Sequence, residues 1–302
     1  MTTLEKIADE LHQPARKTFP RRKTISLFKD DLWQADLIDI QSFSKYNHGF
    51  KFILIVIDTY TKYVWVQALK NKSAKQVTQA MLNILKINQP KLLQTDNGTE
   101  FYNKQFKDLM KKYNIKHYST YSSIKAAIVE RVIRTIKNKI YKKFTATGSY
   151  NWDNSISELI HNYNNTRHRT IKCTPHEARI KFVRLKLIKT KKNLKPKFKI
   201  NDTVRVSKNK YAFSKGYTPQ WSTELFTVSK VFQSDPVTYN IKDDQNNMVL
   251  GRFYNQELLK TDFPNTYLVE RILKRNKNKI FVKWLGFDSS HNSWISSTDI
   301  EK

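Results

Sequence analysis

The sequence predicts a multi-domain protein in which an α/β domain is followed by all-β domains. Three observations support this fold class. Between residues 32 and 168, strand-type segments come first and then alternate with helix-type segments. From Arg179 to Lys199 the chain has ten Lys or Arg and no Asp or Glu, which indicates a basic linker. Beyond it, short apolar and aromatic segments separated by turn residues are typical of small β-sheet domains.

Composition points to nucleic acid as the partner. The 302 residues include 55 Lys and Arg against 26 Asp and Glu, a formal net charge of +29. Clustered cations bind phosphates by displacing their counterions. The alternative is a lysine bias in the coding genome. No apolar run has membrane-spanning length, no secretory signal is expected, and one cysteine excludes a disulfide scaffold.

The elements follow in order along the chain. Residues 4–11 predict a short amphipathic helix ended by Pro14, and the basic stretch 15–23 predicts an extended arm. Ser73 is the expected N-cap of the first core helix. The α/β domain is expected to contain strands at 32–40, 51–58, 62–69, 91–96 and 115–120, and helices at 73–87, 103–113, 125–144 and 151–168.

Three acidic residues stand at positions suited to metal binding. Asp36 lies within the first strand, Asp96 ends the fourth, and Glu130 begins a long helix that carries Arg134 and Lys137 at i+4 and i+7. If the first and fourth strands are neighbours, both aspartates can face one site. Such a triad suits two Mg²⁺ or Mn²⁺ ions, which promote displacement at phosphorus. Alternatively, the aspartates are strand-edge charges and Glu130–Arg134 is a surface pair.

The segments around these acids resemble the retroviral-type integrase core of the RNase H-like superfamily. They are WQADLIDI, LQTDNGTEF, KAAIVERVIRTIK and YNNTRHRTIKCTPHEA, and the likeness extends in particular to integrases of Polinton or Maverick DNA transposons. The resemblance implies that Asp36, Asp96 and Glu130 are catalytic and bind two Mg²⁺ or Mn²⁺ ions. It also implies 3′-end processing, strand transfer into target DNA, a dimer or tetramer holding two element ends, and a nuclear location.

DNA contacts are expected from residues of the same motifs and of the basic linker, namely Asn97, Arg134, Lys137, Lys189, Lys191 and Lys192. Two features depart from the family pattern. The 33 residues between Asp96 and Glu130 are slightly fewer than usual, which predicts a shorter loop at 118–125. The His/His/Cys/Cys zinc module is missing, because no cysteine precedes Cys173, so no zinc is expected in this chain.

The C-terminal segments resemble two further modules. Residues 198–262 are similar to the small β-barrel that follows the core in these integrases, and 265–302 are similar to a chromodomain. In the latter, Tyr267, Trp284 and Phe287 fall where the family places its methyl-lysine cage, which implies binding of a methylated histone tail. Trp294 is expected to fill the core of this module. Alternatively, the barrel is a structural spacer and all four rings are core residues.

The predicted organisation is therefore a helix and basic arm at 1–28, an RNase H-like core at 29–178, a basic linker at 179–197, a small β-barrel at 198–262 and a chromodomain at 265–302. The function expected from it is metal-dependent DNA integration with chromatin targeting. Two other functions remain open. The chain is alternatively a nuclease of the same fold that only hydrolyses, or a domesticated DNA- and chromatin-binding protein without enzymatic activity.

Overall fold

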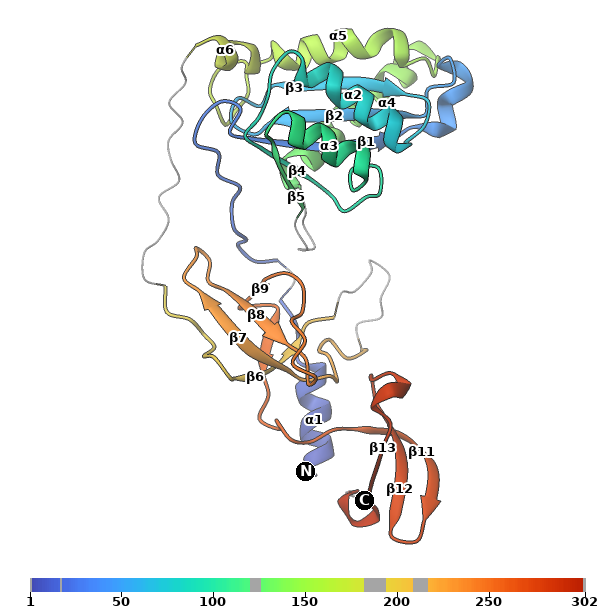
Figure 1. Ribbon diagram of the computed structural model, residues 1–302, viewed down its shortest axis with the longest axis vertical. Coiled ribbons are helices and arrows are strands. Elements are labelled where there is room, and N and C mark those ends of the chain that lie inside the picture. Colours follow the sequence, from blue (N-terminus) through green and yellow to red (C-terminus); the bar gives the residue numbers. More distant parts are fainter. Residues whose placement is uncertain (1, 17, 120–125, 182–193, 209–216, 301–302) are drawn as a thin grey trace. The chain divides into compact units, whose positions relative to one another are not determined.

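The computed structural model describes residues 2–16, 18–119, 126–181, 194–208 and 217–300 (Figure 1). Contacts divide the chain into two compact units. The core unit spans residues 24–188, and the second unit combines residues 1–23 with residues 189–302. Among the described residues, none of the helices is long and apolar enough to cross a membrane.

A mixed five-stranded sheet forms the centre of the core unit. Its strands are β1 (Leu32–Asp39), β2 (Phe52–Asp58), β3 (Val64–Leu69), β4 (Leu92–Thr95) and β5 (Lys116–Ser119). They lie in the order β3-β2-β1-β4-β5, in which β1, β2 and β3 are antiparallel and β4 and β5 run parallel to β1. The predicted antiparallel start followed by alternation of helices and strands is confirmed, and the short η1 (Gln41–Tyr46) links β1 to β2.

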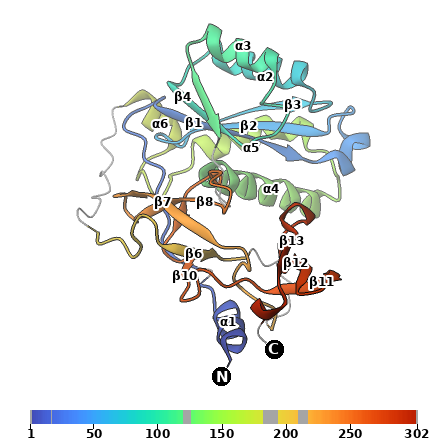
Figure 2. The same ribbon diagram turned by 60° about the horizontal axis from the view of Figure 1, so that its bottom comes forward.

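Helices cover both faces of this sheet. They are α2 (Ala74–Leu85), α3 (Lys104–Lys112), α4 (Ala127–Thr147), α5 (Asp153–Asn164) and α6 (Pro175–Ile180). One core cluster joins α2 and α3 to the sheet face that carries Trp33 and Ala35, and a second joins α4 and α5 to the face that carries Ile38 (Figure 2). Ser73 caps α2 as predicted, by accepting a hydrogen bond from the backbone N–H of Gln76.

The predicted helix at 151–168 is shorter in the structure. It ends at Asn164, whose side chain bonds both backbone groups of Val64 on the outer strand β3, each at 2.9 Å. This pairing satisfies the backbone groups of Val64, which are buried at the edge of the sheet. A further helix, α6, was not predicted. Its signal is Thr174-Pro175-His176-Glu177, a capping box with Pro at the first helical position.

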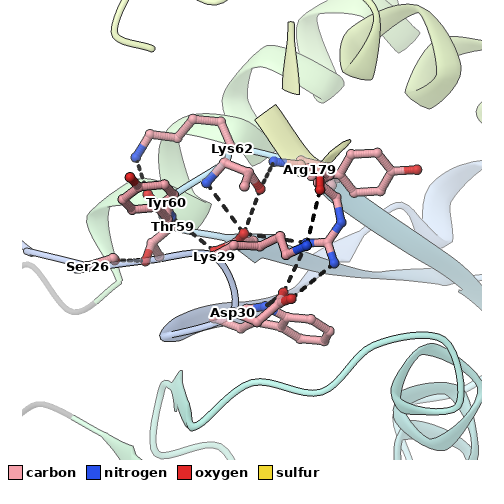
Figure 3. Close-up of polar contacts among 12 residues, drawn as sticks. Ser26, Lys29, Asp30, Thr59, Tyr60, Lys62 and Arg179 are labelled. Carbon is pink, nitrogen blue, oxygen red and sulfur yellow. Dashed lines mark hydrogen bonds and ion pairs between the residues drawn. The ribbon is translucent and has the colours of Figure 1, made fainter. Parts of the chain in front are cut away.

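A buried ion network ties α6 back to the sheet (Figure 3). The Arg179 guanidinium donates to both carboxylate oxygens of Asp30, at 3.0 and 3.2 Å, and to Asp58 at 3.5 Å. Its carbon also lies 4.8 Å from the ring centre of Trp65. Burial raises the pKa of Asp58, and a hydrogen bond from the Thr61 hydroxyl partly offsets this. Arg179 therefore compensates two carboxylates at the end of the sheet where β1 begins.

The second unit contains the N-terminal helix and an antiparallel sheet. Helix α1 (Thr3–His12) begins with the capping box of Thr2 and Glu5. The sheet comprises β6 (Thr203–Val206), β7 (Phe226–Phe232), β8 (Thr238–Lys242), β9 (Phe253–Tyr254) and β10 (Leu258–Lys260), in the order β10-β6-β7-β8-β9. In the part that the structure describes, β9 and β10 do not pair, so the predicted closed barrel is not found. Strands of two and three residues offer too few backbone groups for closure.

Helix α1 packs on this sheet. Its apolar side chains Ile7 and Leu11 are buried with Trp221. Glu10 on the same helix is 5% exposed and forms an ion pair with Arg205 of β6, which is 1% exposed. Since a buried charge is stable only when it is paired, this contact specifies where α1 docks. The N-terminal segment and the chain beyond residue 188 thus share one core.

The last part of the second unit is a three-stranded antiparallel sheet of β11 (Val269–Asn276), β12 (Lys279–Trp284) and β13 (Ser293–Ser296), with η2 (Ser289–His291) and η3 (Ser297–Asp299). Ile280 and Val282 are its buried residues. The expectation that Trp294 fills this core is wrong. Trp294 is 46% exposed, because its place on β13 puts it opposite Phe281, on the other side of the sheet from Ile280 and Val282.

Candidate functional site

Asp36 and Asp96 lie on neighbouring strands. Strand β1 pairs in parallel with β4, and the register sets Leu32 opposite Leu92 and Gln34 opposite Gln94. The pairing ends at Gln34 and Gln94, and continuing its offset of 60 residues would bring Asp96, just after the end of β4, beside Asp36. The charge of Asp96 acts on Asp36, which agrees with this placement. The expected site of two aspartates required the first and fourth strands of the core to be neighbours, and they are. Parallel strands deliver their carboxyl ends to one edge of a sheet, where functional groups of α/β proteins gather.

A buried glutamine links these strands to α4. The Gln34 amide donates to the Gln94 side-chain oxygen at 2.9 Å. Its own oxygen accepts from the backbone N–H groups of Ile128 and Val129, at 3.1 and 3.0 Å. These belong to the first turn of α4, whose N-cap residue, Ala126, makes no side-chain capping bond. Gln34 thus acts as the cap from another part of the chain.

This cap holds Glu130 on the same side of the sheet as Asp36. Residues alternate between sheet faces along β1, so Gln34 and Asp36 share the face that α4 covers. Glu130 lies in the first turn of α4 and is exposed. Arg134 is exposed and Lys137 half-buried one and two turns further along the helix.

The electrostatics of Asp36 reflect a cluster of like charges. Burial is the main cause that raises its pKa to about 6, and the 2.7 Å hydrogen bond from the Leu37 N–H counteracts it in part. The negative charges of Asp96, Glu130 and Glu100 raise it further. Asp36 is therefore harder to ionise than a free aspartate, and a bound cation would stabilise its charged form.

The donor chemistry of this cluster fits a hard divalent cation. Its groups are carboxylates from β1, the end of β4 and α4, and oxygen donors of this kind are what Mg²⁺ and Mn²⁺ prefer. As the side chains of the described residues stand, no three His, Cys, Asp or Glu groups converge closely enough to enclose a metal ion. Asp36, Asp96 and Glu130 are the residues that would hold one.

Glu100 is a fourth acid that the sequence interpretation overlooked. A Cβ at Gly98 would lie 2.6 Å from both carboxylate oxygens of Glu100, so only glycine lets that carboxylate fold back here. The Gly98 N–H also donates to Asp96 at 3.1 Å. The sequence contained the signal, because Glu100 stands two residues after Gly98 in the motif LQTDNGTEF. Asn97 is exposed, and its side-chain oxygen accepts from the Ser119 hydroxyl.

Some expected site residues lie outside the described residues. Lys189, Lys191 and Lys192 of the basic linker are among them, as is most of the loop expected at 118–125.

The three rings expected to form a cage come together in the second unit. The ring centre of Tyr267 lies 5.9 Å from Trp284 and 6.0 Å from Phe287, both in edge-to-face geometry. Tyr267 is 39% exposed. Phe287 also packs against His291, 5.2 Å away. Tyr267 thus contacts both other rings, and neighbouring aromatic rings of this kind attract a cationic side chain.

Acidic groups surround this ring cluster. The His291 ring lies 3.0 Å from Asp288 and 3.7 Å from Asp244. The hydrogen bond to Asp288 is the main cause that raises the pKa of His291. Gly286, with φ +87°, is needed between Trp284 and Phe287 because a Cβ there would overlap the Thr223 side chain. The rings thus lie beside carboxylates, which favours a positively charged ligand.

In sequence, part of the core unit is similar to the integrase core domain. Residues 29–122, which include Asp36 and Asp96, match the family model of the integrase core domain. The chain is 32% identical over 187 residues to an uncharacterized transposon-derived protein of Caenorhabditis elegans, covering 61% of this chain and 64% of that protein. It is 30% identical over 124 residues to the Pol polyprotein of radiation murine leukemia virus, covering 40% and 21%.

One solved structure is similar to this chain in fold, at low sequence identity. A chain of the simian T-cell lymphotropic virus intasome, solved in complex with a PP2A regulatory subunit, aligns with a TM-score of 0.63 and 17% identity, covering 88% of this chain and 93% of that one. The present chain spans less than two thirds of either relative's length. Residues 29–122 are thus similar in sequence to integrase core domains, and the fold of the chain is similar to that of the intasome chain.

Proposed function

We propose that the protein is a transposon integrase that processes the 3′ ends of its element and joins them to target DNA. The observation that carries this proposal is the parallel pairing of β1 with β4, together with the capped first turn of α4 that carries Glu130. Asp96 and Glu130 both act on the charge of Asp36, which indicates that the three acids lie near one another. The transposon-derived relative supports an origin in a mobile element, here of the Polinton or Maverick type.

The residues have separate tasks in the proposed reaction. Asp36, Asp96 and Glu130 would hold two Mg²⁺ or Mn²⁺ ions, which when bound activate the attacking oxygen and stabilise the leaving one. Arg134 and Lys137 follow Glu130 along α4 and would hold DNA phosphates beside the acids. Partial burial of Asp36 and the neighbouring carboxylates raise its pKa to about 6, so a bound cation would stabilise its charged form.

The assay needs no knowledge of the element's termini. Purified protein is mixed with a duplex library whose terminal base pairs are randomised, a plasmid target, and Mg²⁺ or Mn²⁺. Library–plasmid junctions are then amplified and sequenced. We expect junctions with metal and none with EDTA, and no junctions from Asp36→Asn, Asp96→Asn or Glu130→Gln. Glu158→Gln, which removes an exposed carboxylate of α5, is the matched control and should behave as wild type.

The alternatives give different results in this assay. A nuclease would nick the plasmid without forming junctions, and a domesticated binding protein would do neither. Metal binding has its own readout, because Mg²⁺ or Mn²⁺ should raise the melting temperature of wild type but not of Asp36→Asn. Strand transfer by any one of the three acid variants at the wild-type level would remove that residue from the site.

The same proposal includes assembly and location. Joining two element ends requires at least two active sites, so we propose a homo-multimer, a dimer or tetramer, acting in the nucleus. Sedimentation with and without end DNA tests the assembly.

We further propose that the C-terminal sheet is a chromodomain that targets integration to marked chromatin. Two observations support this. The ring centre of Tyr267 lies 5.9 Å from that of Trp284 and 6.0 Å from that of Phe287. The carboxylate of Asp244 lies 3.7 Å from His291, which packs on Phe287. A desolvated cation–π contact contributes about 2 kcal/mol, so Trp284→Ala should weaken binding of a trimethyl-lysine histone peptide at least tenfold. Trp294→Ala is the matched control. Equal affinity for methylated and unmethylated peptides would contradict the proposal.

A further inference from the structure

An aromatic pair, the exposed Trp294 and the half-buried Phe281, lies on the three-stranded sheet, on the side away from the ring cluster. Side chains alternate along β12, so Ile280, Val282 and Trp284 share one face and Phe281 points to the other. The register sets Phe281 opposite Trp294 of β13. Their ring centres are 5.3 Å apart at an interplanar angle of 40°. Trp294 is 46% exposed, which is unusual for a tryptophan that has only a structural role.

Cations frame this pair. Lys274 of β11 is the cross-strand partner of Phe281, so Lys274, Phe281 and Trp294 form one row across the sheet. The row beside it sets Arg271 opposite Lys283. Between residues 269 and 284 the chain has six basic residues and one acid, Glu270, whose carboxylate lies 2.7 Å from Lys283. On this side of the sheet Arg271, Lys274 and Lys279 are exposed, whereas Arg275 is paired with Ile280 and so belongs to the other side.

Charge separates the two faces of this small sheet. The carboxylates of Asp244 and Asp288 lie at the ring cluster, against His291. The surface around Phe281 and Trp294 carries cations instead. A cationic peptide suits the first surface and is repelled by the second, and two copies of the second surface would repel each other. Its complementary partner is a polyanion that also offers flat apolar groups.

We propose that Phe281, Trp294 and the surrounding cations form a binding surface for single-stranded nucleic acid. Bases of a single strand are free to stack on exposed rings, while lysines track the phosphates. In a duplex the bases are already stacked on one another, so only phosphates would be available here. This surface is separate from the acidic cluster of the core unit, and it needs no integrase activity to operate.

The test compares three probes by fluorescence anisotropy on the full chain: a mixed-sequence single strand of 12 nucleotides, an abasic strand of the same length, and the matched duplex. The double variant Phe281→Ala/Trp294→Ala should lose about tenfold in affinity for the normal strand and little for the abasic strand, because it removes stacking and keeps every charge. Lys274→Glu should weaken binding of both strands, because it acts on phosphates.

Matched controls keep the result specific. Tyr46→Ala removes an exposed ring of η1 in the core unit and should leave strand affinity unchanged, and Lys111→Glu reverses an exposed charge on α3 for comparison with Lys274→Glu. Ultraviolet cross-linking of the wild type should join the strand to a peptide containing Phe281 or Trp294. Wild-type affinity of the double variant for the normal strand would overturn the proposal. So would equal losses for the normal and abasic strands, or self-association that the double variant abolishes.

Discussion

Replacing Gln34 with Leu should detach the first turn of α4 from the sheet and thereby displace Glu130. Gln34 is fully buried and supplies the acceptor for two backbone N–H groups that have no partner within the helix. Leucine fills a similar volume but accepts no hydrogen bond. The perturbation therefore removes the cap without opening a large cavity.

The magnitude follows from the contacts. Loss of a helix cap costs about 1 kcal/mol, and leaving the buried N–H of Val129 without an acceptor costs about 1–3 kcal/mol. We expect the free energy of unfolding of the core unit to fall by about 2–4 kcal/mol. If about 2 kcal/mol of this loss appears as fraying of the first turn, the ratio of frayed to intact molecules rises about 30-fold, and strand transfer falls by up to the same factor.

Hydrogen exchange and strand transfer test this together. In Gln34→Leu, the amides of Ile128 and Val129 should exchange at least tenfold faster than in wild type, while those further along α4 keep most of their protection. The control is Gln94→Leu, which removes the acceptor of the Gln34 amide but keeps the bonds from Gln34 to α4. It should therefore have the smaller effect on both measurements. Unchanged protection of Ile128 and Val129 in Gln34→Leu would refute the capping argument.

Three further perturbations have definite expected outcomes. Replacing Arg134 and Lys137 together with Ala should weaken DNA binding for all sequences and reduce the slope of log affinity against log salt by about 1.8, measured by anisotropy from 50 to 200 mM salt; an unchanged slope would show that they do not contact phosphates. Arg179→Ala should destabilise the core unit by about 3–5 kcal/mol in urea titrations, because it leaves two carboxylates without their cation, and Arg179→Lys should recover part of the loss. Burial lowers the pKa of His117 to about 4, so protonation favours the unfolded chain and this residue's contribution to stability is lost as pH falls from about 6.5 to 4; His117→Gln should be less sensitive to acid over that window, and parallel pH curves would contradict the assignment.

The local elements of the core unit could be predicted from sequence because their signals are local. Hydrophobic runs predicted β1, β2 and β3, and Ser73 predicted the start of α2. Helix α6 was missed although its capping box was present in the sequence. The small β-barrel predicted at 198–262 is not confirmed, because short apolar segments predict strands but not whether the end strands meet. Trp294 was misplaced because the side of a sheet depends on register, which hydrophobicity alone does not specify.

For the candidate site, the sequence by itself determined which residues bear the chemistry, whereas the tertiary structure decided how they meet. Spacing and motif singled out Asp36, Asp96 and Glu130. No local pattern could show that a glutamine 94 residues before Ile128 caps α4, because that bond exists only once β1 lies beside the helix. The docking of α1 through Glu10 and Arg205, 195 residues apart, is likewise a property of the folded chain. Periodicity and capping act over a few residues, but pairing of strands and burial of charges depend on contacts that folding alone creates.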